Sequence, residues 1–184
     1  TWDDLRNAAK TLTDADNNIY GLDLPIYDKN GGYTWNWLPF LWQNGGEFLN
    51  DDRTEAVFNS PEGVEALEFW KKMVQEDKSV PLQAAPTGVN RFTSGITAMV
   101  LDGPWSLNTF LSDPEFKDKF GVAPLPQKKT RATVVGGEGV AVFSNTKSPQ
   151  EAYDYLVHLT CSDFVQTFWE NWITIPPQPE FKDF

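Results

Sequence analysis

The sequence is nearly free of the residues that bind transition metals or pair as nucleophile and base. Among its 184 residues there is one cysteine, Cys161, and one histidine, His158. A lone thiol forms no internal disulfide, and these two side chains cannot supply the ligand set of a structural zinc site. We therefore expect no metal and no cofactor, and we interpret both residues as structural parts of one helix.

Positive charge is also scarce, and long apolar runs are absent. The chain has 15 Lys and Arg against 26 Asp and Glu, a formal net charge of −11. This excess of acid disfavours nucleic acid and anionic membranes as partners, and leaves neutral and cationic small ligands open. No run reaches the roughly 18 apolar residues of a membrane-spanning helix, and no charged-then-apolar leader is present. We expect a compact globular chain with no nucleic-acid partner.

Aromatic residues, by contrast, are abundant. There are eight Trp, thirteen Phe and five Tyr, within a composition that is 40% hydrophobic and 22% charged. Such a balance predicts a packed core rather than disorder, and most of the aromatic side chains are expected simply to fill that core.

Short signals predict alternating helices and strands. Capping patterns open helices at Thr1, Ser60 and Ser148, and the apolar segment 35–43 is a further helix that Asn44-Gly45-Gly46 ends. Apolar runs predict strands at 20–25, 96–101, 121–125 and 139–143. This alternation indicates an α/β fold, with helices packed on a central mixed sheet.

Several helices carry more detailed predictions. Pro39 should lie in the first turn of its helix or kink it. Apolar stripes are predicted to face the core in two helices, one formed by Val64, Leu67, Trp70, Met73 and Val74, the other by Ala152, Tyr155, Leu156 and Leu159. A last helix is expected from Ser162, with Trp169 and Trp172 on its apolar side.

The stretch from Phe92 to Trp105 is the most informative. A short polar helix is expected to end at Gly95, a buried strand follows, and Gly103-Pro104 starts the next helix with Pro at its first position. Trp105 then lies where the carboxyl end of a strand opens into a helix, the usual place for ligand clefts in α/β folds.

In this order, the motifs resemble the carboxyl-terminal lobe of an extracellular solute-binding protein of sugar ABC importers, of the maltose-binding-protein type. The resemblance is carried by turns and caps whose order and spacing agree almost from end to end: Thr1-Trp2-Asp3-Asp4-Leu5, Gln43-Asn44-Gly45-Gly46, Phe58-Asn59-Ser60-Pro61-Glu62-Gly63, Phe92-x-x-Gly95-x-x-Ala98-Met99, Asp102-Gly103-Pro104-Trp105, Ala123-Pro124-Leu125-Pro126, and Gly136-Gly137 before Val140-Ala141-Val142. It implies a periplasmic-binding-protein-like (type II) fold, with residues 1–184 as a single lobe of a longer, two-lobed protein.

The resemblance also implies a function and partners. Members of this family close two lobes on a solute, and the closed form is recognised by a membrane transporter. We expect a non-enzymatic, monomeric binding lobe for a carbohydrate, and an oligosaccharide is the favoured class. The expected partners are the missing amino-terminal lobe and the permease subunits of the ABC transporter. The expected location is extracellular, either tethered to the cell surface as a lipoprotein or periplasmic.

Trp105 is the first candidate for ligand contact. Pyranose rings have apolar faces and polar rims, so sugar sites combine flat aromatic platforms with a few directional hydrogen-bonding groups. The resemblance places the tryptophan of this turn against the ligand. The alternative is a core tryptophan that covers the end of a strand.

A second group of candidates is Tyr33, Trp35, Asn36 and Trp37, where the resemblance implies aromatic ligand contacts. Trp35 and Trp37 lie about 200° apart around a helix, at about 100° per residue. We therefore expect one of these two side chains to be available to the cleft, while Trp42 belongs to the core.

Weaker candidates are Gly136, Gly137, Glu138 and Asp102. The two glycines would let backbone N–H groups approach a sugar hydroxyl, with Glu138 adding a carboxylate. The alternative is an ordinary turn before a strand. An isolated acid such as Asp102 or Glu138 is more often solvated than bound to a ligand.

Two other functions stay open at this point. A glycoside hydrolase fragment would need two carboxylates about 5 to 10 Å apart, one of them with a raised pKa, and no motif singles out such a pair. The same binding fold could instead take a polyamine or a peptide, and the acidic charge fits a polyamine. A metal complex is disfavoured by the single His and Cys.

Overall fold

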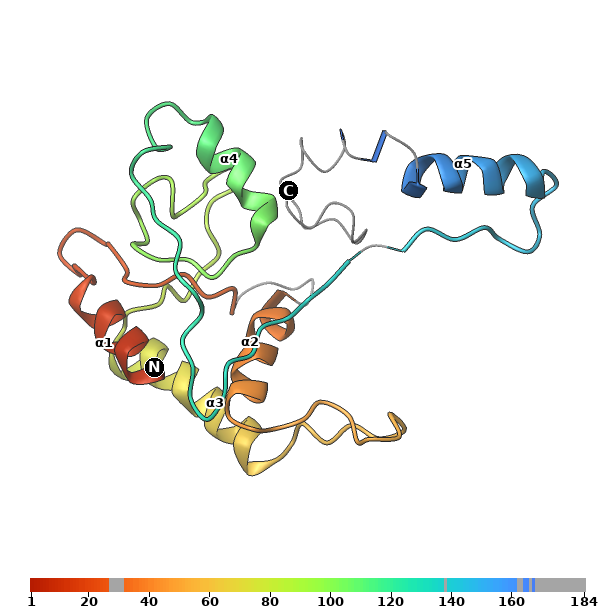
Figure 1. The fold of residues 1–184 in the computed structure, drawn as a ribbon. Helices are drawn as coiled ribbons and strands as arrows, with labels where there is room; N and C mark the ends of the chain where they lie inside the picture. The colour runs from red at the N-terminus through yellow and green to blue at the C-terminus, as the bar shows by residue number, and fades with distance from the viewer. Residues whose placement is uncertain (27–31, 138, 162–163, 166, 168–184) are drawn as a thin grey trace. The chain divides into compact units, whose positions relative to one another are not determined.

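A computed structural model describes residues 1–26, 32–137, 139–161, 164, 165 and 167 (Figure 1). The chain divides into two compact units. The first comprises Thr1–Leu101 and Gly121–Val135, and the second comprises Asp102–Phe120 and Gly136–Phe184. The interpretation of residues 1–184 as one lobe stays a prediction.

Three helices form the first unit: α1 (Trp2–Thr11), α2 (Gly32–Gln43) and α3 (Pro61–Lys71), the last continued by a π-helical turn, η1 (Lys72–Glu76). The Thr1 hydroxyl accepts the Asp4 N–H at 3.2 Å, and the Asp4 carboxylate bonds back to Thr1. The Ser60 hydroxyl accepts the Gly63 N–H, also at 3.2 Å. The helix starts predicted at residues 1 and 60 are therefore confirmed.

The helix α2 starts earlier than predicted. It begins at Gly32 rather than Trp35, which places Pro39 in the helix interior and not in its first turn. Proline has no N–H, so the usual hydrogen bond from residue 39 to the Trp35 carbonyl is missing. The helix ends as predicted, because Gly45 adopts φ 83° in the turn after Gln43.

The predicted central sheet is not formed among the described residues, which contain only isolated bridges. Two of the four expected strands pair in parallel, through the bridges Tyr20–Thr97 and Asp23–Val100. The Tyr20 N–H donates to the Ile96 carbonyl at 2.9 Å, and the Ala98 N–H donates to the Tyr20 carbonyl at 2.9 Å. This pairing is short of a continuous ladder, so the central mixed sheet stays a prediction.

The other two expected strands, at 121–125 and 139–143, are not formed in the described residues. Segment 121–125 is largely exposed, and Pro124 within it has no N–H to donate to a neighbouring strand. Segment 139–143 is exposed throughout, with Phe143 79% accessible. The short polar helix expected before Gly95 is also wrong: residues 91–95 form turns, which Gly95 closes at φ 72°.

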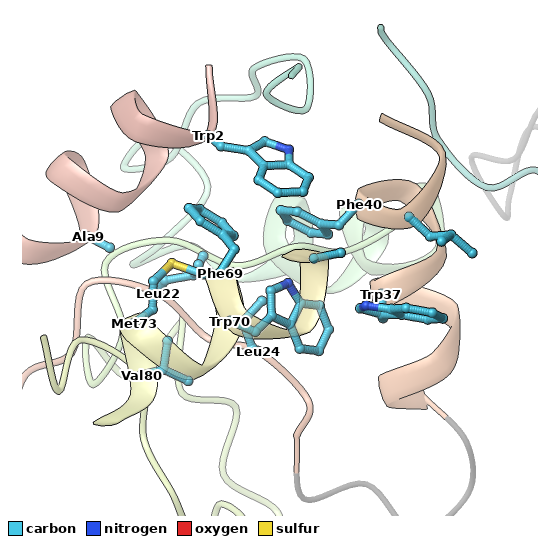
Figure 2. Packing of buried hydrophobic residues seen from close by; sticks show 12 residues of the cluster. Trp2, Ala9, Leu22, Leu24, Trp37, Phe40, Phe69, Trp70, Met73 and Val80 are labelled. Carbon is cyan, nitrogen blue, oxygen red and sulfur yellow. The ribbon is translucent and has the colours of Figure 1, made fainter. Parts of the chain in front are cut away.

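An aromatic core joins the three helices of the first unit (Figure 2). Trp2 packs on Phe69 at 4.8 Å between ring centroids and on Phe40 at 5.5 Å, while Phe40 meets Trp70 edge-on at 5.6 Å. The remaining buried members are Ala9, Leu22, Leu24, Trp37, Leu41, Ala66, Met73 and Val80. Trp42 is partly buried against this cluster, in keeping with its predicted core role.

The buried face of α3 differs from the predicted stripe. Trp70 and Met73 are buried as expected, but Val64 and Leu67 are 48% and 54% exposed. The face that packs instead begins with the small residues Gly63 and Ala66. A Cβ on Gly63 would lie 2.1 Å from the Phe58 carbonyl oxygen, so the start of the helix leaves no room for a side chain at this position.

The second unit contains a short 3-10 turn η2 (Pro104–Ser106), the helix α4 (Leu107–Ser112) and the helix α5 (Pro149–Cys161). Phe110 packs edge-on against Phe116 and Phe120, at 5.8 and 5.4 Å between centroids. The helix starts at Pro104 and Pro149 are confirmed. Among the described residues, no helix is long and apolar enough to cross a membrane.

The helix α5 corrects two predictions, those for Tyr155 and Cys161. Tyr155, expected on its buried face, is 63% exposed. His158 is exposed and stacks on Phe164 at 5.3 Å, and Cys161 is exposed rather than packed. Within the described part of the chain no residue of α5 is buried, and its predicted stripe residues Ala152, Leu156 and Leu159 are half-buried. The helix expected from Ser162, with Trp169 and Trp172, lies mostly outside the described residues.

Candidate functional site

Trp105 lies in the turn that opens the second unit. Gly103 is extended, Pro104 is the first residue of η2, and Trp105 follows with 52% of its surface exposed. Trp105 is therefore not fully buried, and its contact with a ligand stays a prediction. A large, half-exposed indole on a short, hydrogen-bonded turn is a flat apolar platform with access to solvent.

The indole of Trp105 folds back over Gly103. A Cβ built on Gly103 would lie 2.2, 2.2 and 2.6 Å from the ring carbons Cη2, Cζ3 and Cε3 of Trp105. A point nearly equidistant from three consecutive ring carbons lies over the ring face rather than beyond its edge. One face of the six-membered ring is thus covered by the backbone of Gly103.

Asp102 holds the backbone of the same turn. Its Oδ1 accepts the Gly103 N–H at 2.8 Å, and its Oδ2 accepts the Ser106 hydroxyl at 2.5 Å. Both carboxylate oxygens therefore bond within residues 102–106. This arrangement suits a residue that shapes the turn better than one whose oxygens are reserved for a sugar hydroxyl.

The second candidate group belongs to α2 in the first unit. Trp37 is buried, with 7% exposed, and meets Phe58 edge-on at 6.2 Å between centroids, whereas Trp35 is 37% exposed. Trp35 is therefore the exposed tryptophan of the pair, and its availability to a ligand cleft stays a prediction. Asn36 is half-buried, and the side chain of Tyr33 lies outside what the structure describes.

The third candidate group is the glycine pair before residue 140. Gly136 and Gly137 are exposed, and a Cβ on Gly137 would have no neighbour within 4 Å. The surroundings of Gly137 therefore offer no crowding that would require glycine there. Glu138 lies outside the described residues. The role of this group in binding stays a prediction.

Two carboxyl groups in the described part of the chain, those of Asp77 and Glu65, have lowered pKa values because they bond to side chains that hold the fold together. Arg6 donates to the Asp77 carboxylate at 2.5 and 2.9 Å, and this hydrogen bonding lowers the pKa of Asp77. Hydrogen bonds from Lys128 and then Asn44 lower the pKa of Glu65. A glycosidase acid needs the opposite shift, a raised pKa. The described residues also contain no group of three or more His, Cys, Asp or Glu side chains that could hold a metal ion.

Sequence reasoning did not single out Gly103 or Ser106 as contributors to the site. A partial signal was nevertheless present, because proline at the first helical position marks Gly103 as the residue before a helix start.

Two solved structures that match this chain hold a carbohydrate. An ABC transporter solute-binding protein from Thermotoga lettingae, bound with alpha-D-tagatose, is 30% identical and superposes with a TM-score of 0.83 over 96% of this chain and 46% of that one. The protein Lmo0181 of Listeria monocytogenes, in complex with cycloalternan, is 26% identical with a TM-score of 0.78 over 99% of this chain and 46% of that one. These matches confirm the binding-protein fold predicted from the sequence.

Sequence relatives agree with the structural ones. The chain is 26% identical over 148 residues to the lactose-binding protein of Rhizobium radiobacter, which covers 78% of this chain and 34% of that protein. The chain spans about half or less of the length of the relatives it matches. The predicted family is confirmed, and it is one of solute-binding proteins rather than enzymes. With residues 1–163 matching its model, the chain belongs to the bacterial extracellular solute-binding protein family.

Proposed function

We propose that this chain supplies the carbohydrate-binding surface of an ABC importer's extracellular solute-binding protein, with Trp105 as the principal stacking platform. The observation that carries the proposal is the Trp105 indole, 52% exposed and backed on one face by Gly103. A covered face and an open face are what stacking on the apolar side of a sugar ring requires.

Trp35 is the second platform in this proposal. It is exposed on the same helix whose neighbouring Trp37 is anchored in the core, so the backbone beneath it is held in place. Asn36 and Tyr33 next to it, and the backbone of Gly136 and Gly137 with Glu138, would add polar contacts to sugar hydroxyls. Trp37 and Asp102 are assigned supporting roles, because one is buried and the other bonds within its own turn.

An oligosaccharide is the ligand class we favour. The relatives' names include a lactose-binding protein and a maltotriose-binding protein, and a structural neighbour holds cycloalternan. The proposed partners are the remaining half of the protein, which would complete a two-lobed cleft, and the permease subunits of the transporter. We propose a monomer located outside the cytoplasmic membrane.

Intrinsic tryptophan fluorescence of the full-length protein tests this function. The protein is titrated with a panel of mono- and oligosaccharides, with spermidine and a peptide mixture as controls for the polyamine and peptide alternatives. A saturable change with one sugar class is the expected result. A response to spermidine or peptides with none to any sugar would overturn the carbohydrate assignment while leaving the family assignment intact.

A further inference from the structure

Gly103 has a conformation that any residue can adopt. Its backbone angles are φ −115° and ψ 177°, in the extended region, so no steric demand of the backbone calls for glycine. Glycine is needed at this position instead because the Trp105 indole occupies the space that a side chain would fill. Any Cβ at residue 103 would lie 2.2 Å from two carbons of the Trp105 ring, far inside van der Waals contact.

The turn beneath the indole is held by hydrogen bonds from both a side chain and the backbone. Asp102 accepts the Gly103 N–H at 2.8 Å and the Ser106 hydroxyl at 2.5 Å, and the Ser106 N–H donates to the Gly103 carbonyl at 3.2 Å. Residues 102–106 therefore form a closed hydrogen-bonded turn. Pro104 further restricts this turn, because its ring fixes φ.

We propose that Gly103 is a positioning residue that holds the Trp105 indole as a preformed platform, acting through the ring and not by touching the ligand. This inference rests on the proposed function. With one face seated on Gly103, the indole is ordered before the ligand arrives, and the entropy cost of fixing its two side-chain torsions is already met in the free protein. The opposite face is left for the sugar.

The free protein offers a test that needs no ligand. Protons over an aromatic ring face resonate upfield, so the Gly103 α-protons should be shifted upfield in the NMR spectrum of the full-length protein. The shift should vanish in Trp105→Ala and be unaffected by Trp35→Ala. Gly103 α-protons at ordinary positions in the wild-type protein would refute the inference, whatever the protein binds.

Sugar affinity provides the second test, as a double-mutant cycle. Gly103→Ala should weaken binding by about two- to tenfold, the range of one aromatic contact, without lowering the melting temperature. In the Trp105→Ala background, Gly103→Ala should have no effect on binding, because the indole through which Gly103 acts is absent. Gly121→Ala is the matched control, since a Cβ there meets nothing within 4 Å.

The outcomes separate the two proposals. A wild-type protein that binds no sugar contradicts the proposed function, and the NMR shift then decides the role of Gly103 alone. A protein that binds sugar and loses affinity in Trp105→Ala but not in Gly103→Ala refutes the positioning role. Equal losses from Gly103→Ala in the presence and absence of Trp105 would also refute it.

Discussion

Replacing Gln43 by alanine is expected to destabilise the first unit by about 2–4 kcal/mol. Gln43 is fully buried, and its Oε1 accepts the Trp2 indole N–H at 2.7 Å while its Nε2 donates to the Ala132 carbonyl at 2.9 Å. Alanine would leave the Trp2 donor buried without its acceptor, which costs about 1–3 kcal/mol, and would add a cavity. The Gln43 carbonyl would keep its bonds from the N–H groups of Lys129 and Thr130, so the variant isolates the side chain.

Urea unfolding followed by circular dichroism measures this effect as a shift in midpoint at unchanged slope. The matched control is Gln150→Ala, an exposed glutamine whose loss should change the unfolding free energy by less than about 0.5 kcal/mol. In a Trp2→Phe background, which removes the donor, Gln43→Ala should cost less than it does alone. A loss below about 0.5 kcal/mol for Gln43→Ala in the wild-type background would refute the reasoning.

Three further predictions concern stability. Asp77→Asn should cost about 1–3 kcal/mol at pH 7, because it weakens the charged pair with Arg6. Since folding lowers the pKa of Asp77, that contribution is present above the unfolded pKa of about 3.9 and is lost as pH falls through the folded value, so the melting curves of the variant and wild type should converge in acid. Met73→Ala should cost about 2–5 kcal/mol whereas Leu67→Ala, on the exposed face of α3, should cost under about 1, and equal losses in urea unfolding would contradict the observed helix face. Trp37→Ala should lower the melting temperature through about 3–5 kcal/mol of lost packing, and a variant that melts like the wild type would remove Trp37 from the core.

Local signals predicted local structure well. Capping residues fix helix starts through bonds within four residues, so Thr1 and Ser60 could be assigned from sequence alone. The end of α2 at Gly45 was predictable for the same reason, because a left-handed residue after a helix favours glycine. Proline at the first position of η2 marked the turn that carries Trp105.

Features that depend on distant partners were predicted less well. The apolar pattern of α3 predicts Val64 and Leu67 on its buried face, but both are exposed. The buried face includes Phe69, which packs on Trp2 of α1 and Phe40 of α2, and these partners lie far along the chain. Strand pairing likewise depends on neighbours far along the chain, so the runs at 121–125 and 139–143 looked like strands although they have no assigned partner in the described residues.

The candidate site likewise has features that follow from neighbouring residues in the sequence and features that depend on packing in the fold. The turn position of Trp105 followed from Gly103-Pro104, but the seating of its ring on Gly103 required coordinates. For Trp35 and Trp37 helical geometry predicted that only one could be available, and the identity of the exposed one was decided by packing of Trp37 against Phe58.

Isothermal titration of the full-length protein with the sugar that it binds, compared with its Trp105→Ala variant, tests the central claim most directly. The account predicts that the variant keeps the wild-type melting temperature but loses about 1 kcal/mol or more of binding free energy, about fivefold or more in Kd, while Trp105→Phe retains most of the affinity. A Kd for Trp105→Ala equal to that of the wild type would contradict the claim that this exposed indole is the platform on which the sugar stacks.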